Sequence, residues 1–281
     1  MAIRIITDSS ADITPEFAAK AGITVIPLPV TFGDTTYDTM DASLFYEKLM
    51  EGSSFPKTSQ PSPQTLCDVF EEAKEADDAV IAILLSSALS GTYQCACLAK
   101  DMVDYSEIYL VDSLSATIVL KILAEEALKL CDQGASAPEI VAVLEELKGR
   151  IKIHAVIDTL EYLYKGGRLS KGEAQIGTLA NLKPVITVSK EGTVKVTDKG
   201  IGLGMSSKAI LKKLKLADLD PDYPIYPVYT YAQTNCLAFC KKILAQNPDL
   251  VLAEPSHVGS VIGTHIGPHA FGIVIVTKPE A

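Results

Sequence analysis

Hydroxyl side chains gather in three stretches where they could hold the oxygen atoms of an anion. Residues 7–10 (TDSS) follow one apolar run, residues 86–92 (SSALSGT) follow another, and residues 58–60 (TSQ) precede a proline-capped helix signal. Such hydroxyls, with the backbone N–H groups at a helix start, form sites for carboxylate or phosphate oxygens. Each stretch taken alone is an ordinary cap or turn. Three of them converging would favour a ligand.

The apolar runs before these stretches are typical of buried parallel strands. The run at 79–85 (AVIAILL) is short, continuous and aliphatic, and a helix pattern follows it. Strand and helix signals alternate through the first half of the chain, as strand-helix-strand units with right-handed crossovers require. This pattern predicts a doubly wound, mainly parallel sheet with helices on both faces. Ligands of such sheets bind at the carboxyl ends of the strands, where the strand order reverses.

The pattern changes near residue 152, and the second half predicts a mixed sheet of about six strands. A hairpin signal at 189–192 (SKEG) lies between two alternating segments, so part of this sheet is antiparallel. Two helices are expected at 207–217 and 235–246. The six strand candidates are 154–159, 184–190, 193–199, 225–231, 249–254 and 271–276. We therefore expect an α/β protein of two domains, residues 1–152 and 153–281.

Local signals place several element ends. Thr14 and Ser62 each precede a proline, which predicts two helix N-caps, and Gly52 predicts a helix end. Residues 55–63 (FPKTSQPSP) are too rich in proline for a helix or a strand. The span 255–277 lacks Lys, Arg, Asp and Glu, but its dense glycines indicate a glycine-rich loop followed by a buried strand rather than a membrane helix.

Composition narrows the class of partner. A formal net charge of −10 over 281 residues repels phosphate backbones and anionic membrane surfaces, so we expect neither nucleic-acid binding nor stable membrane insertion. With 48% hydrophobic and 21% charged residues the chain is globular. Its N-terminus has no signal-peptide pattern, which predicts a cytoplasmic protein. The six cysteines form no C-x-x-C motif and are expected to be buried free thiols.

Motifs of common enzyme classes and metal sites are absent. The sequence has no G-x-S-x-G and no P-loop, and the glycines at 200–204 lack dinucleotide-binding spacing. His265 and His269 are separated by Gly267 and Pro268, which excludes a helical metal-ligand pair. We therefore expect no metal. His265 is either a hydrogen-bond donor to an anionic group or a loop histidine whose partners are backbone atoms.

Residues 158–171 (DTLEYLYKGGRLSK) form a second unusual segment. Asp158 can cap a short helix that Gly166 and Gly167 end, which leaves Arg168 and Lys171 on an exposed turn. These cations complement the helix dipole, or in an otherwise acidic protein they face a partner or a phosphate group.

Five motifs in this order resemble the DegV family of bacterial lipid-binding proteins, over the whole length of the chain. The resemblance implies a two-domain α/β protein with a long-chain fatty acid buried between the domains. In the family the carboxyl group is held by residues that correspond to Thr58 and Ser90. The motifs are TDSSADI (7–13), KTSQPSP (57–63), SSALSGTYQ (86–94), DTLEYLYKGGRLSK (158–171) and IGTHIGPHAFG (262–272).

The resemblance also implies a role without catalysis by the chain itself. Such proteins are substrate-carrying subunits of fatty acid kinase: they present the carboxylate to a separate ATP-dependent kinase, and the acyl-phosphate passes to a phosphate acyltransferase for phospholipid synthesis. No cofactor is implied besides the bound fatty acid. The head-group residues would be Thr58, Ser90, His265, Ser9, Gly91 and Thr92. The partner-contact residues would be Arg168, on the kinase-facing surface or in the head-group network beside it, and Lys171.

Two departures from the family pattern and two rival functions stay open at this point. Residues 198–210 (DKGIGLGMSSKAI) place Lys199 and Lys208 around a neutral, glycine-rich stretch where the family often has basic residues. His269 stands where the family commonly has glycine, which would reshape the pocket near His265. One rival is a stand-alone hydrolase or phosphotransferase that uses Ser90 or His265. The other is a carrier of a different amphipathic anion.

Overall fold

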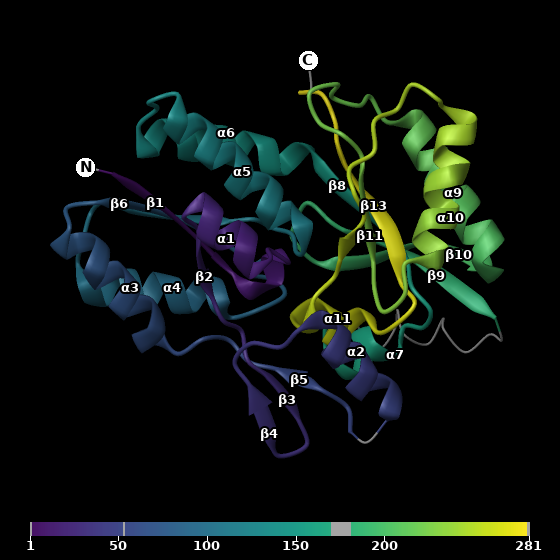
Figure 1. Ribbon diagram of the computed structural model, residues 1–281, viewed down its shortest axis with the longest axis horizontal. Helices are drawn as coiled ribbons and strands as arrows, with labels where there is room; N and C mark the ends of the chain where they lie inside the picture. Colours follow the sequence, from purple (N-terminus) through teal and green to yellow (C-terminus); the bar gives the residue numbers. More distant parts are fainter. Residues whose placement is uncertain (1, 53, 170–180, 280–281) are drawn as a thin grey trace. The chain divides into compact units, whose positions relative to one another are not determined.

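The computed structural model describes residues 2–52, 54–169 and 181–279 of the chain (Figure 1). The chain forms two compact units. The first unit comprises Met1–Thr39, Thr58–Gly149 and Lys190–Gly192, and the second comprises Met40–Lys57, Arg150–Ser189 and Thr193–Ala281. Within the described residues no helix is both long and apolar enough to cross a membrane.

A four-stranded parallel sheet forms the centre of the first unit. Its strand order is β2-β1-β6-β7, with β1 at Ile3–Asp8, β2 at Thr24–Ile26, β6 at Ala79–Leu84 and β7 at Ile108–Asp112. The chain first extends the sheet on one side of β1 and then continues on the other side, so the strand order reverses between β1 and β6. The predicted doubly wound sheet is confirmed.

Helices cover both faces of this sheet because alternate strand residues point to opposite sides. Ile6, Val80 and Ala82 pack against α3 and α4 in one buried cluster. Ile5 and Ile81, of opposite parity, are equally buried, and α5 contacts β1 and β6. The helices of this part of the chain are α1 (Pro15–Ala21), α3 (Pro63–Glu75), α4 (Thr92–Val103), α5 (Ile118–Asp132) and α6 (Ala137–Arg150).

Both N-caps read from the sequence are present. Thr14 accepts a hydrogen bond from the N–H of Phe17, and Ser62 accepts one from the N–H of Thr65. A three-stranded sheet has the order β4-β3-β5. Its strands are β3 (Val30–Phe32), β4 (Thr35–Tyr37) and β5 (Lys57–Thr58). The sequence predicted an extended segment at 23–33, which covers β3, but it predicted neither β4 nor β5.

The prediction that residues 55–63 form no strand was therefore wrong at two positions. Lys57 and Thr58 lie between prolines but keep their own N–H groups, so they can join a ladder. The next residue, Ser59, donates its N–H to the carbonyl of Pro29 at 3.0 Å, which extends the pairing.

The second unit contains the predicted mixed sheet of six strands. Its order is β10-β9-β8-β13-β11-β12, and every pair is antiparallel except β11 with β12. The strands are β8 (Ile151–Val156), β9 (Leu182–Val188), β10 (Val194–Ile201), β11 (Tyr226–Tyr229), β12 (Ser256–His257) and β13 (Phe271–Val276). Helices α9 (Gly202–Leu216) and α10 (Thr234–Gln246) pack on one face through a buried cluster that includes Val156, Ile210, Phe239 and Ile273.

One predicted strand, residues 249–254, is wrong. None of these residues is buried and Val251 is 70% exposed, although Leu250 and Leu252 are half-buried against the core cluster of the second unit. Only an isolated bridge joins Leu252 to Ile225. The sixth strand is instead β12, two residues long.

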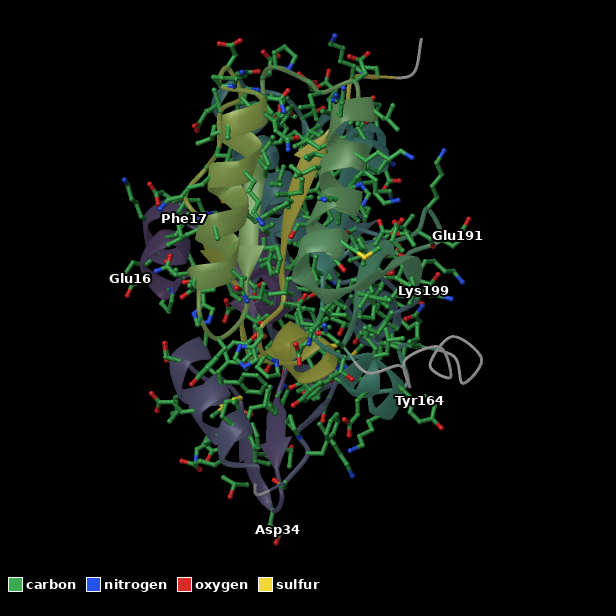
Figure 2. The ribbon with its side chains drawn as sticks, turned by 90° about the vertical axis from the view of Figure 1, so that its right-hand side faces the viewer. Glu16, Phe17, Asp34, Tyr164, Glu191 and Lys199 are labelled. Carbon is green, nitrogen blue, oxygen red and sulfur yellow. The ribbon has the colours of Figure 1, made fainter. Side chains whose placement is uncertain are left out.

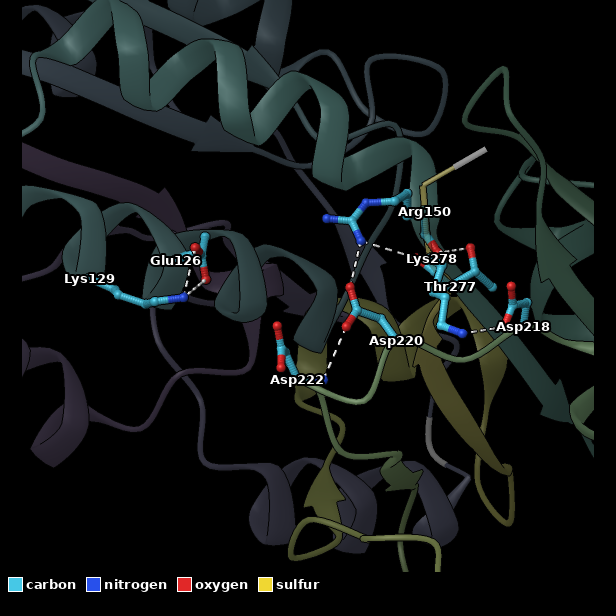
Figure 3. Close-up of polar contacts among 8 residues, drawn as sticks. All are labelled: Glu126, Lys129, Arg150, Asp218, Asp220, Asp222, Thr277 and Lys278. Carbon is cyan, nitrogen blue, oxygen red and sulfur yellow. Dashed lines mark hydrogen bonds and ion pairs between the residues drawn. The ribbon is translucent and has the colours of Figure 1, made fainter. Parts of the chain in front are cut away.

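Polar contacts join the start of β8 to the end of β13, its neighbour in the sheet of the second unit (Figure 3). The Arg150 guanidinium donates to the Asp220 carboxylate at 2.7 Å and to the carbonyl of Thr277 at 3.1 Å. Both charged side chains are largely buried, at 15% and 13% exposure. Lys278 pairs with Asp218 at 3.0 Å.

Three short helices of the second unit pack through glycine. They are α2 (Ala42–Glu51), α7 (Glu161–Lys165) and α11 (Ser260–Ile266). A Cβ on Gly263 of α11 would lie 2.5 Å from the hydroxyl of Tyr46 and 2.7 Å from the ring of Phe45. Because of this packing, Met40–Lys57 groups with the second unit, whereas the predicted boundary at residue 152 places it in the first. The glycine-rich loop that the sequence predicted before β13 contains a helix, α11.

Candidate functional site

The loop from β6 to α4 lies at the point where the strand order reverses. The carbonyl of Ser86 accepts the N–H groups of Leu89 at 2.9 Å and Ser90 at 3.1 Å, which folds the loop into a tight turn. Gly91 is the N-cap residue of α4, and Thr92 is its first residue. The position of Ser90 therefore follows directly from the position of Ser86.

The start of α4 is suited to hold an anion. The Ser90 hydroxyl lies 2.8 Å from the Thr92 hydroxyl and also accepts the N–H of Thr92 at 3.3 Å. The N-cap residue, Gly91, has no side chain with which to cap the helix, and the first turn holds no acidic residue. The first N–H groups of a helix have no partner within it and carry partial positive charge. Ser90 is half-buried and Thr92 is buried.

The Thr58 loop lies beside this helix start. A Cβ on Gly91 would overlap the side-chain carbonyl of Gln60, which shows how closely the two residues approach. The Cys95 thiol, in the first turn of α4, donates to the carbonyl of Pro61 at 3.3 Å. The structure thus brings residues 58–60 together with residues 90–92, as expected for two loops that share a ligand. Thr58 is half-buried at the end of β5.

The third hydroxyl stretch has its own partners within the first unit. Ser9 accepts the N–H of Leu28 at 2.9 Å, which anchors the connection between β2 and β3. Thr7 donates its hydroxyl to the carbonyl of Ile83 at 2.8 Å. These two contacts join β1 to its neighbours, and they give Ser9 a structural task besides its predicted contact with a head group.

Sequence reasoning missed a fourth hydroxyl stretch. Ser113, Ser115 and Thr117 follow β7 and are buried at the same sheet edge. The Ser115 carbonyl accepts the N–H of Ser86 at 2.9 Å, so this stretch supports the loop that carries Ser90. The signal was available, because the apolar run before Ser113 predicts a parallel strand, and the carboxyl ends of parallel strands share one edge.

Two aspartates end the strands that flank β6. Asp8, fully buried at the end of β1, accepts hydrogen bonds from the N–H and hydroxyl of Ser10 and from the N–H of Leu85. Burial raises the pKa of Asp8, although these three donors act in the opposite direction. Asp112, at the end of β7, accepts the N–H groups of Ser87 and Leu114.

His265 lies in the second unit, on α11. Its ring packs directly on Gly166, where any Cβ would overlap the imidazole. Burial and the nearby Arg168 lower the pKa of His265 to about 3. The ring is therefore neutral near pH 7, and it can donate or accept a hydrogen bond without bringing a positive charge.

The turn after α7 differs from its prediction. Arg168 is half-buried rather than exposed: its guanidinium donates to the carbonyl of Gly166 at 2.5 Å, and burial lowers its pKa. Asp158 does not cap the helix, because its carboxylate pairs with Lys183 and the helix begins only at Glu161. Gly166 and Gly167 end the helix as predicted. Lys171 lies outside the described residues.

The two departures from the family pattern have local explanations. His269 adopts φ of 63°, a left-handed conformation that favours glycine, and its ring meets Tyr231 edge-on at 5.2 Å. The glycines of the 200–204 stretch form the passage from β10 into α9, with φ of 75° at Gly202. Lys199, on β10, is exposed to solvent (Figure 2).

An open parallel sheet with hydroxyl loops at its switch point is typical of α/β proteins that bind small anionic ligands. The family model described as "Uncharacterised protein, DegV family" matches residues 2–278. The chain belongs to the DegV family, which confirms the resemblance carried by the five motifs. A DegV domain-containing protein of Caldanaerobacter subterraneus is 36% identical over 280 residues, 98% of this chain and 99% of the relative.

Solved structures of relatives share the whole fold. A DegV family protein from Thermus thermophilus, described by its fatty acid binding, has a TM-score of 0.88 at 31% identity, covering 99% of this chain and 100% of that chain. A stearic-acid-binding protein from Eubacterium ventriosum has a TM-score of 0.87 at 26% identity, covering 99% of each chain.

Proposed function

We propose that this protein binds a long-chain fatty acid and holds its carboxylate at the start of α4. The observation that carries the proposal is the pairing of Ser90 and Thr92 at a helix start, beside the loop of Thr58. Two hydroxyls and the N–H groups of a helix start match the two oxygens of a carboxylate. The fatty acids bound by the relatives from Thermus thermophilus and Eubacterium ventriosum support the same chemical class.

A neutral head-group site is sufficient because the acyl chain supplies the affinity. Burying about fifteen methylenes at ~0.8 kcal/mol each yields on the order of 10 kcal/mol before the costs of association. Neutral donors then only have to orient the carboxylate. His265, which burial and Arg168 keep uncharged near neutral pH, is a further neutral donor that we propose for the head group.

The finer proposal is that the protein carries the fatty acid to a separate ATP-dependent kinase, and the acyl-phosphate then passes to a phosphate acyltransferase. A carboxylate held by neutral donors remains a nucleophile for phosphoryl transfer, whereas a bidentate arginine would compete for its lone pairs. Lys171 is proposed as a kinase contact. Arg168, half-buried beside Gly166, fits the network around His265 better than a docking surface.

Direct catalysis by Ser90 is less well supported. A nucleophilic serine needs a base within hydrogen-bond reach. In the described part of the chain, the Ser90 hydroxyl is bonded to Thr92 and to no histidine or carboxylate. A hydrolase or phosphotransferase would therefore have to acquire its base from elsewhere.

The test is equilibrium binding of palmitate to delipidated protein, with Ser90→Ala and the control Ser87→Ala from the same loop. We expect wild type and Ser87→Ala to bind alike, and Ser90→Ala to bind about tenfold more weakly, because one charge-assisted hydrogen bond is lost. Absence of palmitate binding by the wild-type protein would overturn the proposal. Dodecyl sulfate as a competitor separates a fatty acid carrier from a general carrier of amphipathic anions.

The carrier role has a separate readout. Mixed with a fatty acid kinase and ATP, the loaded protein should yield acyl-phosphate, while the protein alone with ATP or an ester should yield no product. Turnover by the protein alone that Ser90→Ala abolishes would favour the rival enzyme.

A further inference from the structure

The loop that carries Ser90 is held from both sides by the strands that flank β6. On one side, Asp8 at the end of β1 accepts the N–H of Leu85 at 2.7 Å. On the other side, the carbonyl of Ser115 accepts the N–H of Ser86, and Asp112 accepts that of Ser87. The first three residues of the loop are thus each fixed by a different acceptor at the sheet edge.

We propose that Asp8 is a positioning residue of the head-group site, an inference that rests on the proposed function. Asp8 holds Leu85, the next residue is Ser86, and the Ser86 carbonyl receives the N–H of Ser90. The hydroxyl of Ser90 in turn meets Thr92 at the start of α4. A short chain of bonds therefore joins a buried carboxylate to the atoms proposed to receive the ligand, without contact between Asp8 and the ligand.

Asp8 needs both carboxylate oxygens for this task. Its Oδ1 accepts the N–H and the hydroxyl of Ser10, at 2.9 and 2.5 Å, while its Oδ2 accepts the N–H of Leu85. Asparagine has a single oxygen, so it can serve Ser10 or Leu85 but not both. If the asparagine oxygen accepts the N–H of Leu85, the asparagine NH₂ group faces the N–H of Ser10. If the oxygen accepts from Ser10, the NH₂ group faces the N–H of Leu85.

Asp112 provides a matched control, because asparagine at this position should keep the hydrogen bonds that the aspartate makes. Its two donors, the N–H groups of Ser87 and Leu114, both meet Oδ1, at 3.1 and 3.0 Å. Asparagine at this position can keep both bonds. Asp8→Asn and Asp112→Asn thus make the same chemical change at equivalent strand ends, and only the first must leave a buried N–H, that of Ser10 or that of Leu85, without its acceptor.

The experiment compares palmitate with hexadecanol, which has the same chain but no carboxylate. We expect Asp8→Asn to weaken palmitate binding about tenfold, because one buried N–H loses its acceptor, and to leave hexadecanol binding within about twofold. Asp112→Asn should bind both ligands like the wild type. Asp220→Asn, which breaks a largely buried ion pair of the second unit, controls for general loss of stability.

A second readout separates positioning from loss of structure. In a Ser90→Ala background, Asp8→Asn should weaken palmitate binding by no more than about twofold, because the group it positions is already gone. Equal losses for palmitate and hexadecanol, or full additivity with Ser90→Ala, would overturn the inference. If the wild-type protein binds neither ligand, the proposed function fails instead. If it binds palmitate and Asp8→Asn is unchanged, only the role of Asp8 fails.

Discussion

Two regions carry the candidate head-group residues, and they are built by different forces. In the first unit, hydrogen bonds from strand ends place Ser90 and the start of α4. In the second unit, direct packing of rings on glycine places His265, because α11 and α7 approach neighbouring side chains too closely for any Cβ. The first region is therefore sensitive to the loss of a polar atom, and the second to the gain of a carbon atom.

The second region should suffer most from a single added methyl group. Gly263→Ala puts a Cβ within 2.5 Å of the Tyr46 hydroxyl and 2.7 Å of the Phe45 ring, and both aromatic side chains are fully buried. We expect a loss of about 1–3 kcal/mol in the free energy of unfolding, measured by urea denaturation.

Gly204→Ala is the matched control for that substitution. Gly204 also lies in a helix, α9, and its Cβ would meet no atom within 4 Å. Here alanine should leave stability unchanged or raise it by up to ~1 kcal/mol, because it favours the helix. Equal destabilisation by both substitutions would contradict a packing origin for the glycines of α11.

Acid should weaken the second region through its neutral histidine. The folded-state pKa of His265, about 3, lies below its ordinary value of 6.5. Between these values the unfolded chain binds a proton that the folded chain does not, so stability falls as pH drops from 6.5 toward 3. His265→Gln removes this contribution and should lose less stability than wild type between pH 7.5 and 5.

His154 should contribute to acid sensitivity in the same way, because burial lowers its pKa to about 4. Urea denaturation at both pH values should therefore show residual acid sensitivity in His265→Gln. An unchanged pH dependence would mean that the ring of His265 is accessible to protons in the folded protein.

The layout of the fold was largely readable from the sequence. The buried strands of the first unit are continuous apolar runs, and the hydroxyl caps at Thr14 and Ser62 mark their helices. Strands β5 and β12, of two residues each, are too short for any pattern to be visible. Helix α11 was hidden because Gly263 suits the rings of α2, which are distant in sequence, rather than the helix that contains it.

The sequence predicted which loops of the candidate site share a sheet edge, but not which of their side chains are in contact. Parallel strands predict that residues 86–92 lie at one sheet edge, but no pattern shows that Gln60 covers Gly91. The carboxylate of Asp8 looked like one more polar loop residue, because its donors come from two separate strand ends. The neutral state of His265 likewise depends on burial and on Arg168, contacts that only the folded chain reveals.

The smallest change in stability is expected at His269, where backbone strain and a ring contact act in opposite directions. His269 holds a left-handed backbone, with φ of 63°, and its ring meets Tyr231 edge-on. His269→Gly relieves backbone strain of about 1 kcal/mol but loses a ring contact of similar size, and glycine also gains freedom in the unfolded chain. The net change in the free energy of unfolding should stay below ~1 kcal/mol in urea. A loss well above that would show that the ring contact dominates here, as it does around Gly263.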